Sequence, residues 1–463
     1  MKNNEKLLYT IGETEDVPDI PEKSKGTGWI KWAAIGSGLC AAAAVLAVVL
    51  MGGAGGGYDL PYNTSDTFES TSSQPEQNVS ENTEDTAATT PEPAVTTSKI
   101  DWAEVSIYPE IDWESENSEL EPVIPSLGNE GMGFEGITVS DPSELHEREG
   151  QTRWQEAAER GALPVFRNRI ADNWTSHGGV FIYLSEEEMN KIAENVAYVL
   201  GTEITSTETM YGEYIEYSGD YPTQEQFETA PSMPHMIIAQ CADGTELWVE
   251  GNGTIKVEFG TAVALPSGAA FITDDDNSLE KAKEFILERF ADLMQFENPT
   301  FRAEHNVSEY NVYDADDDPV RDLLNYYMRK VDFCNYETEN AVHLIWISNS
   351  YCGAEYIGDY PIITIDKAQE MLLEGKYLTT VVDERFIKNG VVSAEDIEVA
   401  KLVYRCSSGH DKYFMPYYCF YVELDNSWQA EPYSSELTYG AFYVPAVSEE
   451  YLSDLTVWNG SFN

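Results

Sequence analysis

Residues 29–51 form one continuous apolar run, WIKWAAIGSGLCAAAAVLAVVLM, in which Lys31 is the sole charged residue. As a helix rising about 1.5 Å per residue, this run would be about 34 Å long, enough to cross a hydrocarbon core of about 30 Å. Lys23, Lys25 and Lys31 lie at its front edge, whereas the next basic residue after it is Lys99. Because basic residues mark the cytoplasmic side of a span, we expect a single-pass protein of the cell membrane with a cytoplasmic N-terminus and an extracytoplasmic C-terminal domain.

Two other interpretations of this run fit less well. A cleaved signal peptide would begin with a short basic segment, but residues 1–28 are polar and of mixed charge. A lipoprotein anchor at Cys40 would need a small residue before the cysteine, and Leu39 occupies that position. We therefore expect the run to remain in the protein as a transmembrane helix.

The chain is strongly acidic. Its 463 residues include 27 basic and 82 acidic side chains, for a formal net charge of −55. A protein that binds nucleic acid or an anionic polymer needs Lys and Arg to neutralise phosphate. The composition therefore excludes nucleic-acid binding and favours an acidic surface protein surrounded by divalent cations.

Cysteine usage argues against a disulfide framework. Five cysteines follow the apolar run, an odd number without paired spacing in a large domain: Cys241, Cys334, Cys352, Cys406 and Cys419. We expect free buried thiols, with one incidental bridge left open.

Composition divides the chain into a cytoplasmic stub (1–28), the span (29–51), a flexible acidic stalk (52–128) and a folded part that begins near Asn129. The stalk is rich in Ser, Thr, Pro and Glu, so most of it cannot bury enough apolar surface to offset the entropy lost on ordering. Trp, Tyr and Ile residues between Ile100 and Trp113 predict that this stretch docks on the folded domain.

Three helices can be placed from their ends. Ser185 and Glu188 form a capping box, and Gly201 supplies the stop of that helix. A second helix opens at Asn277, and a third starts at Asp366 and ends at Gly375.

Strand patterns follow each helix. The turn Glu250-Gly251-Asn252-Gly253 predicts a hairpin between strands 246–249 and 255–259. Further strands are expected from 131 up to the turn Asp141-Pro142, and at 163–168, 236–242, 331–336, 341–348, 401–406, 416–424 and 439–447. A capped helix followed by antiparallel strands thus recurs in three units, 129–265, 266–358 and 359–463. This repetition predicts an α+β fold with helices on curved antiparallel sheet.

Motifs that could carry chemistry fail on their context. Ser278 and Lys281 match S-x-x-K without its companion motifs, so Ser278 is expected at a helix cap. The stretch Ser408-Gly409-His410-Asp411 places triad residue types side by side, where they cannot converge, and predicts a hairpin turn.

Metal motifs fail similarly. The run Asp314 to Asp318 resembles the start of a Ca²⁺ loop, but Pro319 stands where such a loop needs glycine; we expect Asp318 to cap a helix, with adventitious Ca²⁺ binding as the alternative. The six histidines show no zinc-binding spacing. The sequence therefore names no catalytic, cofactor-binding or metal-binding residue.

Several phrases resemble a family of single-pass membrane proteins of Gram-positive, clostridia-like bacteria: LLYTIGE, GMGFEGITVSD, LPVFRN, ADGTELWVEGNG, IGDYPIITIDKAQEMLLEGKYLTTV, FMPYYCFYVEL and TYGAFYVPAV. More distantly, a helix followed by strands that end in a Pro-aromatic strand is similar to the PepSY-like ectodomains of the YycH and YycI regulators. This resemblance implies an ectodomain that acts through partners, such as a sensor kinase, and carries over no site residue.

We expect a non-enzymatic, membrane-anchored regulator or sensor whose ectodomain binds a protein or an envelope ligand. The alternative is an envelope hydrolase acting on peptide or glycan. The stub could bind a cytoplasmic regulator. In the span, small residues including Gly36 and Ala43 predict a helix–helix contact with a membrane partner or a second copy.

Overall fold

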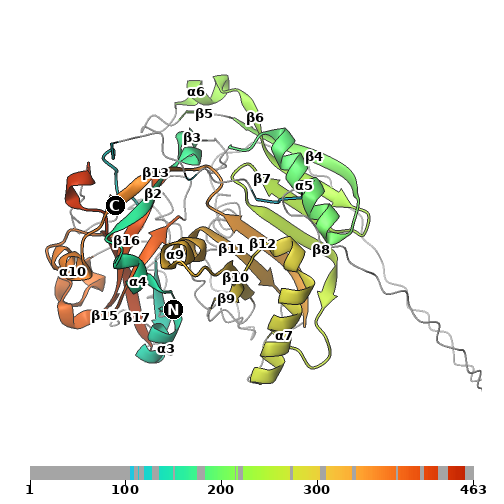
Figure 1. Ribbon diagram of the computed structural model, residues 1–463. Coiled ribbons are helices and arrows are strands. Elements are labelled where there is room, and N and C mark those ends of the chain that lie inside the picture. The colour runs from blue at the N-terminus through green and yellow to red at the C-terminus, as the bar shows by residue number, and fades with distance from the viewer. Residues whose placement is uncertain are drawn as a thin grey trace, which may run out of the picture.

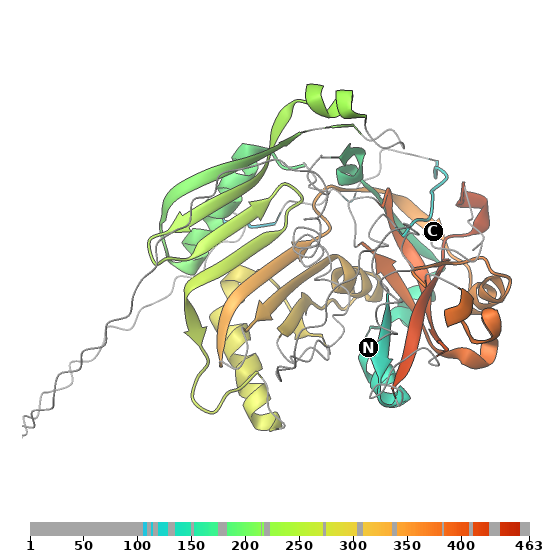
Figure 2. The same ribbon diagram turned by 180° about the vertical axis from the view of Figure 1, so that it is seen from behind.

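We analysed a computed structural model of the chain (Figures 1 and 2). It describes residues 105–108, 113, 119–127, 135–149, 152–174, 183–213, 215–216, 223–271, 275–302, 309–335, 340–381, 384–406, 411–425 and 436–453. The expected stub, the apolar run with Gly36 and Ala43, and most of the expected stalk lie outside these residues. None of the helices within them is long and apolar enough to cross a membrane.

The fold is α+β, as predicted, with two large antiparallel sheets (Figure 1). The first has eight strands in the order β4-β6-β7-β8-β12-β11-β10-β9. Their bounds are β4 Ile204–Glu213, β6 Ser232–Cys241, β7 Glu246–Glu250, β8 Ile255–Ala264, β12 Ala341–Asn349, β11 Arg329–Cys334, β10 Glu309–Asp314 and β9 Pro299–Phe301. The strand order is symmetric, because two four-strand meanders join through their last strands, β8 and β12.

Helices cover one face of this sheet. They are α5 Glu186–Leu200, α7 Asp276–Arg289 and α8 Ala291–Met294. Alternate residues of the strands, such as Ile237, Val257 and Ile345, form one apolar core with these helices. The connection from β4 to β6 holds β5 Ile215–Glu216, which pairs with β3 Asn173–Trp174, and α6 Gln224–Thr229.

The second sheet has seven strands. Its main order is β1-β17-β16-β2-β13, while β14 pairs with β17 and β15 with β16. Their bounds are β1 Gly136–Val139, β2 Ala162–Asn168, β13 Ala354–Pro361, β14 Leu378–Thr379, β15 Ile397–Arg405, β16 Tyr413–Glu423 and β17 Leu437–Pro445. Successive residues of β16 enter two different cores, as Phe420 and Cys419 illustrate, so this central strand is buried on both faces.

Shorter elements complete this half. They are the helices α3 Pro142–Glu149, α4 Trp154–Ala158 and α10 Ile365–Leu373, and the 3₁₀ turns Arg169–Asp172, Glu384–Phe386, Lys388–Gly390, Ala394–Asp396 and Glu449–Tyr451. The chain thus begins in the seven-stranded sheet, then forms the whole eight-stranded sheet, and returns to complete the seven-stranded sheet. The expected unit boundaries do not follow the sheets: β8 and β12 pair across residue 265, and β13 contains residue 358.

Helix α9, Pro319–Met328, connects the two sheets. It lies between β10 and β11 in sequence and contacts both of them. Its apolar residues Leu323, Leu324 and Met328 nevertheless belong to the core of the seven-stranded sheet, where α9 also contacts α4 and β15. Helix α9 therefore connects two strands of the eight-stranded sheet but packs in the core of the seven-stranded sheet.

The N-terminal boundary of the folded part differs from the prediction. We expected a flexible stalk up to residue 128, but Ile107, Val123 and Leu127 are almost fully buried. Ile107 belongs to the core of the eight-stranded sheet, and Val123 forms a bridge with Leu452 beside the other sheet. The predicted docking of the stretch before Trp113 is thus observed in its described residues, 105–108 and 113. A few buried apolar residues order this part of the chain although its average composition is polar.

The sequence predicted the ends of helices more accurately than the N-terminal boundary of the folded part. Helix α5 has the predicted capping box, and Gly201 ends it with φ 75°. Two starts were wrong by about one turn or less. Asp275, not Asn277, precedes α7, and Thr364 rather than Asp366 caps α10, because a second cap-forming residue stands two positions earlier at both places.

Candidate interaction surface

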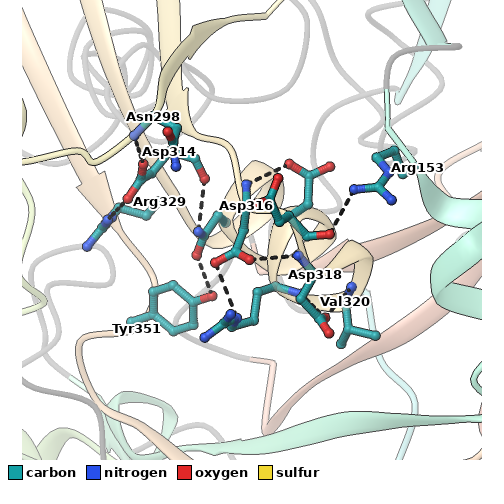
Figure 3. A network of polar contacts seen from close by, with 12 residues as sticks. Arg153, Asn298, Asp314, Asp316, Asp318, Val320, Arg329 and Tyr351 are labelled. Atoms are coloured by element: carbon teal, nitrogen blue, oxygen red, sulfur yellow. Dashed lines mark hydrogen bonds and ion pairs between the residues drawn. The ribbon is translucent and has the colours of Figure 1, made fainter.

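The acidic run Asp314 to Asp318 is a structural network and not a Ca²⁺ loop (Figure 3). Asp318 caps α9, accepting hydrogen bonds from the backbone N–H groups of Val320 and Arg321, with Pro319 as the first helical residue, as predicted. Asp316 accepts from the backbone N–H of Asp318 at 2.8 Å and pairs with Arg321 at 3.2 Å. The carboxylates of Asp316 and Asp318 thus accept hydrogen bonds and ion pairs from groups of the protein itself. Among the described residues no cluster of His, Cys, Asp or Glu could hold a metal ion.

Asp314 joins this network to the first sheet. Its carboxylate accepts from the backbone N–H of Asn298 at 2.8 Å and pairs with Arg329 at 3.1 Å. Its backbone carbonyl accepts from Asn325, whose side-chain oxygen accepts from Tyr351. Burial raises the pKa of Asp314, while the hydrogen bond from the Asn298 N–H and the positive charge of Arg329 oppose that rise.

The other sequence motifs occupy structural positions. Ser278 was expected at a helix cap, but Asp275 occupies that position and Ser278 is the third residue of α7, where its hydroxyl donates to Asp275 Oδ2 at 2.6 Å. Strands β15 and β16 pair antiparallel around the expected turn at 408–411, of which residues 408–410 lie outside the described part. The five cysteines after the apolar run are all free; four are buried, as expected, and Cys406 is partly exposed.

An aromatic and charged row crosses the face of the eight-stranded sheet opposite the helices. Ile238, Trp248, Lys256, Trp346, Asp332 and Asn311 are directly opposite one another on six successive strands. Because they alternate with core residues along each strand, their side chains share the other face. We call this set the cross-strand row.

One end of the cross-strand row is covered by a helix, and over the other end, which we call the open part, no described helix lies. Helix α9 lies over β10 and β11, where Asp332 and Asn311 are buried and Asp332 pairs with Lys330 at 3.0 Å. Trp248, Lys256 and Trp346 are only partly buried. Figure 2 looks onto this face, and none of the described helices lies over β6, β7 and β8.

Lys256 is fixed between two tryptophans at the centre of the row. Its ammonium lies 4.1 Å from the ring centre of Trp248 and 5.8 Å from that of Trp346, and forms an ion pair with Glu258 at 2.7 Å. Its side chain is 13% exposed. The lysine therefore holds both indole rings in place without a helix to pack against.

Carboxylates surround this open part. Glu246 and Glu258 are register partners, and Glu246 accepts from the indole N–H of Trp248. Burial raises the pKa of Glu250 on the same strand, while a hydrogen bond from Asn252 opposes the rise. The surface thus combines aromatic area with acidic groups, which suits a partner that offers apolar and positively charged groups.

Edge strand β4 borders this face. It pairs with β6 along its length, with two register shifts at 204–206 and 210–211. Such bulges twist an edge away from regular pairing. We therefore regard the face, and not the edge, as the candidate surface.

No protein-family model and no curated protein matches this chain. Sequence reasoning predicted β7 and β8 and their hairpin but did not single out Trp248, Lys256 or Trp346. The available signal was a large aromatic or charged residue at each position that alternates with the apolar core residues. What the sequence does not show is which strand pairs with β8 on its other side, and this pairing brings Trp346 to the row.

Proposed function

We propose that the protein is a membrane-anchored, extracytoplasmic regulator or sensor that acts by binding a protein or an envelope ligand. The observation that supports this best is the open part of the cross-strand row, Trp248–Lys256–Trp346. Rigid aromatic residues on a sheet face that none of the described helices covers are typical of interaction surfaces, because they supply large contact area at a low cost in side-chain entropy.

The remaining parts of the proposal come from the sequence. Residues 29–51 are the transmembrane helix, the Ser-, Thr- and Pro-rich stretch after it is the stalk, and the α+β units are of the PepSY or YycI kind. The N-terminus is cytoplasmic, and Gly36 and Ala43 contact a second span. The strongly negative net charge favours partners with basic groups.

A paired substitution tests the proposal. The full-length chain carrying Trp248→Ala and Trp346→Ala is compared with wild type for proteins and wall components that copurify from solubilised membranes. Leu373→Ala, at an exposed residue of α10, is the matched control. We expect loss of a component at least tenfold in the tryptophan variant alone. Identical sets from all three chains would contradict docking at the row.

A further inference from the structure

The first described residues of the chain, 105–108, are bound like an extended peptide between α5 and α8. Ile107 is 1% exposed and belongs to the core of the eight-stranded sheet. Tyr108 stacks with Phe296 at 6.3 Å between ring centres and lies under the guanidinium of Arg329 at 4.6 Å. Its hydroxyl donates to the carbonyl of Met294 at 2.9 Å.

Two side-chain amides hold the backbone of this segment. Gln295 accepts from the Ile107 N–H at 3.1 Å and donates to the Val105 carbonyl at 2.8 Å, as a neighbouring strand would. Asn195 of α5 donates to the Ser106 carbonyl at 2.6 Å. Gln295 is buried and has φ 52°, a left-handed conformation that costs free energy in a residue with a side chain. The fold therefore maintains a strained residue that recognises an extended backbone.

Among the described residues, the rest of the domain follows the segment on its C-terminal side. The next described residue, Trp113, packs against Phe166 and Tyr351 beside the other sheet and is 41% exposed. The hydrogen bonds of residues 105–107 with Asn195 and Gln295 join positions more than 80 apart in the chain. Any chain that supplies the same segment would make the same contacts at the same site.

We propose that residues 105–108 exchange between two copies of the protein, each copy docking its segment between α5 and α8 of the other. A second copy carries the identical segment, and exchange replaces each contact by its equivalent, so the cost is small. Two copies anchored in one membrane by residues 29–51 would also meet at high effective concentration. The proposal does not rest on docking at the cross-strand row.

Complementation between two defective full-length chains tests the exchange. One chain carries Ile107→Asp, which prevents its own segment from docking but keeps its site. The other carries Asn195→Ala and Gln295→Ala, which weaken its site but keep its segment. Both contain Gly36→Leu and Ala43→Leu to remove contacts between spans, and they carry different tags.

The unlike pair is expected to copurify at least tenfold more than either like pair. A synthetic peptide of residues 103–110 should abolish this association, whereas the same peptide with Asp at position 107 should not. Equal recovery from all pairs, or none from the unlike pair, would overturn the exchange.

Thermal melting of each chain shows that it folds, and Ile107→Ala replaces Ile107→Asp if the latter does not. Leu373→Ala, at an exposed residue of α10 away from the segment, is the control and should behave as wild type. Because Trp248 and Trp346 are unchanged throughout, loss of exchange would leave the proposed function untouched.

Discussion

Arg405 places a charged guanidinium in the interior of the seven-stranded sheet. Its side chain is 5% exposed and pairs with Glu135 at 2.6 Å, donates to the Leu127 carbonyl at 2.8 Å, and lies 3.9 Å from Asp411. Tyr443 also donates to Glu135. Arg405 of β15 thereby binds two segments that precede β1: residues 119–127, through Leu127, and Glu135.

Replacing Arg405 by Ala should reduce the free energy of unfolding by about 3–5 kcal/mol, because two carboxylates lose their buried partner. Urea denaturation of the variant measures the loss. Arg160→Ala is the control, since Arg160 pairs with Asp318 at an exposed position and should cost no more than about 1 kcal/mol. Equal effects of both substitutions would show that the Arg405 contacts do not hold these segments.

Asp322 of α9 gives a pH-dependent prediction. Burial raises its pKa above the ordinary value, although a hydrogen bond from the Asp316 backbone opposes the rise. The folded protein therefore binds this proton more tightly than the unfolded chain does. The corresponding stability is present below about pH 4 and is lost as pH rises through the folded-state pKa.

Asp322→Asn removes this dependence while keeping an oxygen that can accept from Asp316. The stability of wild type relative to the variant should therefore fall as pH rises above the unfolded-state pKa of about 3.9, and should level off above the folded-state pKa. Denaturation at several pH values checks this. A difference that is constant, or that grows with pH, would contradict the raised pKa.

At the scale of elements, α5 is the helix whose ends the sequence specifies most fully. Its capping box joins the Ser185 hydroxyl to the Glu188 N–H, and the Glu188 carboxylate accepts from the Ser185 N–H at 2.7 Å. Hydrogen bonds from Ser185 lower the pKa of Glu188.

Ser185→Ala should lower the free energy of unfolding by about 1 kcal/mol. Glu194→Ala, at an exposed position in the same helix, should change it by less than about 0.5 kcal/mol. Thermal denaturation of both variants compares them. A Ser185→Ala variant as stable as wild type would show that α5 is held by packing alone.

These elements also show what sequence could and could not predict. Caps, hairpin turns and alternating strands depend on residues a few positions apart, so α5, α9 and the β7–β8 hairpin were predicted. The pairing of β8 with β12, the burial of Ile107 and the packing of α9 in the second core depend on residues far apart in the chain. No local pattern encodes these three features. The cross-strand row, which supports the proposed function, depends on the pairing of β8 with β12.

At the scale of the whole molecule, the folded domain begins before residue 107. Lys99 is the sole trypsin site between residues 32 and 147, and the next, Arg148, lies in α3. Brief trypsin treatment of the native full-length chain should therefore leave a stable fragment that starts at Ile100. Its N-terminus is measured by mass spectrometry. A stable fragment starting at Glu149 would show that residues 105–127 are not part of the domain.

We propose that the open face of the eight-stranded sheet is where the whole molecule binds its partner. The most direct measurement is photo-crosslinking in intact cells, with a photoreactive phenylalanine derivative at Ile238, the end of the cross-strand row next to β4. The same probe at Leu373 is the control. The account predicts a discrete adduct of one defined mass from position 238 and none from position 373. No adduct from position 238, or the same adducts from both positions, would contradict it.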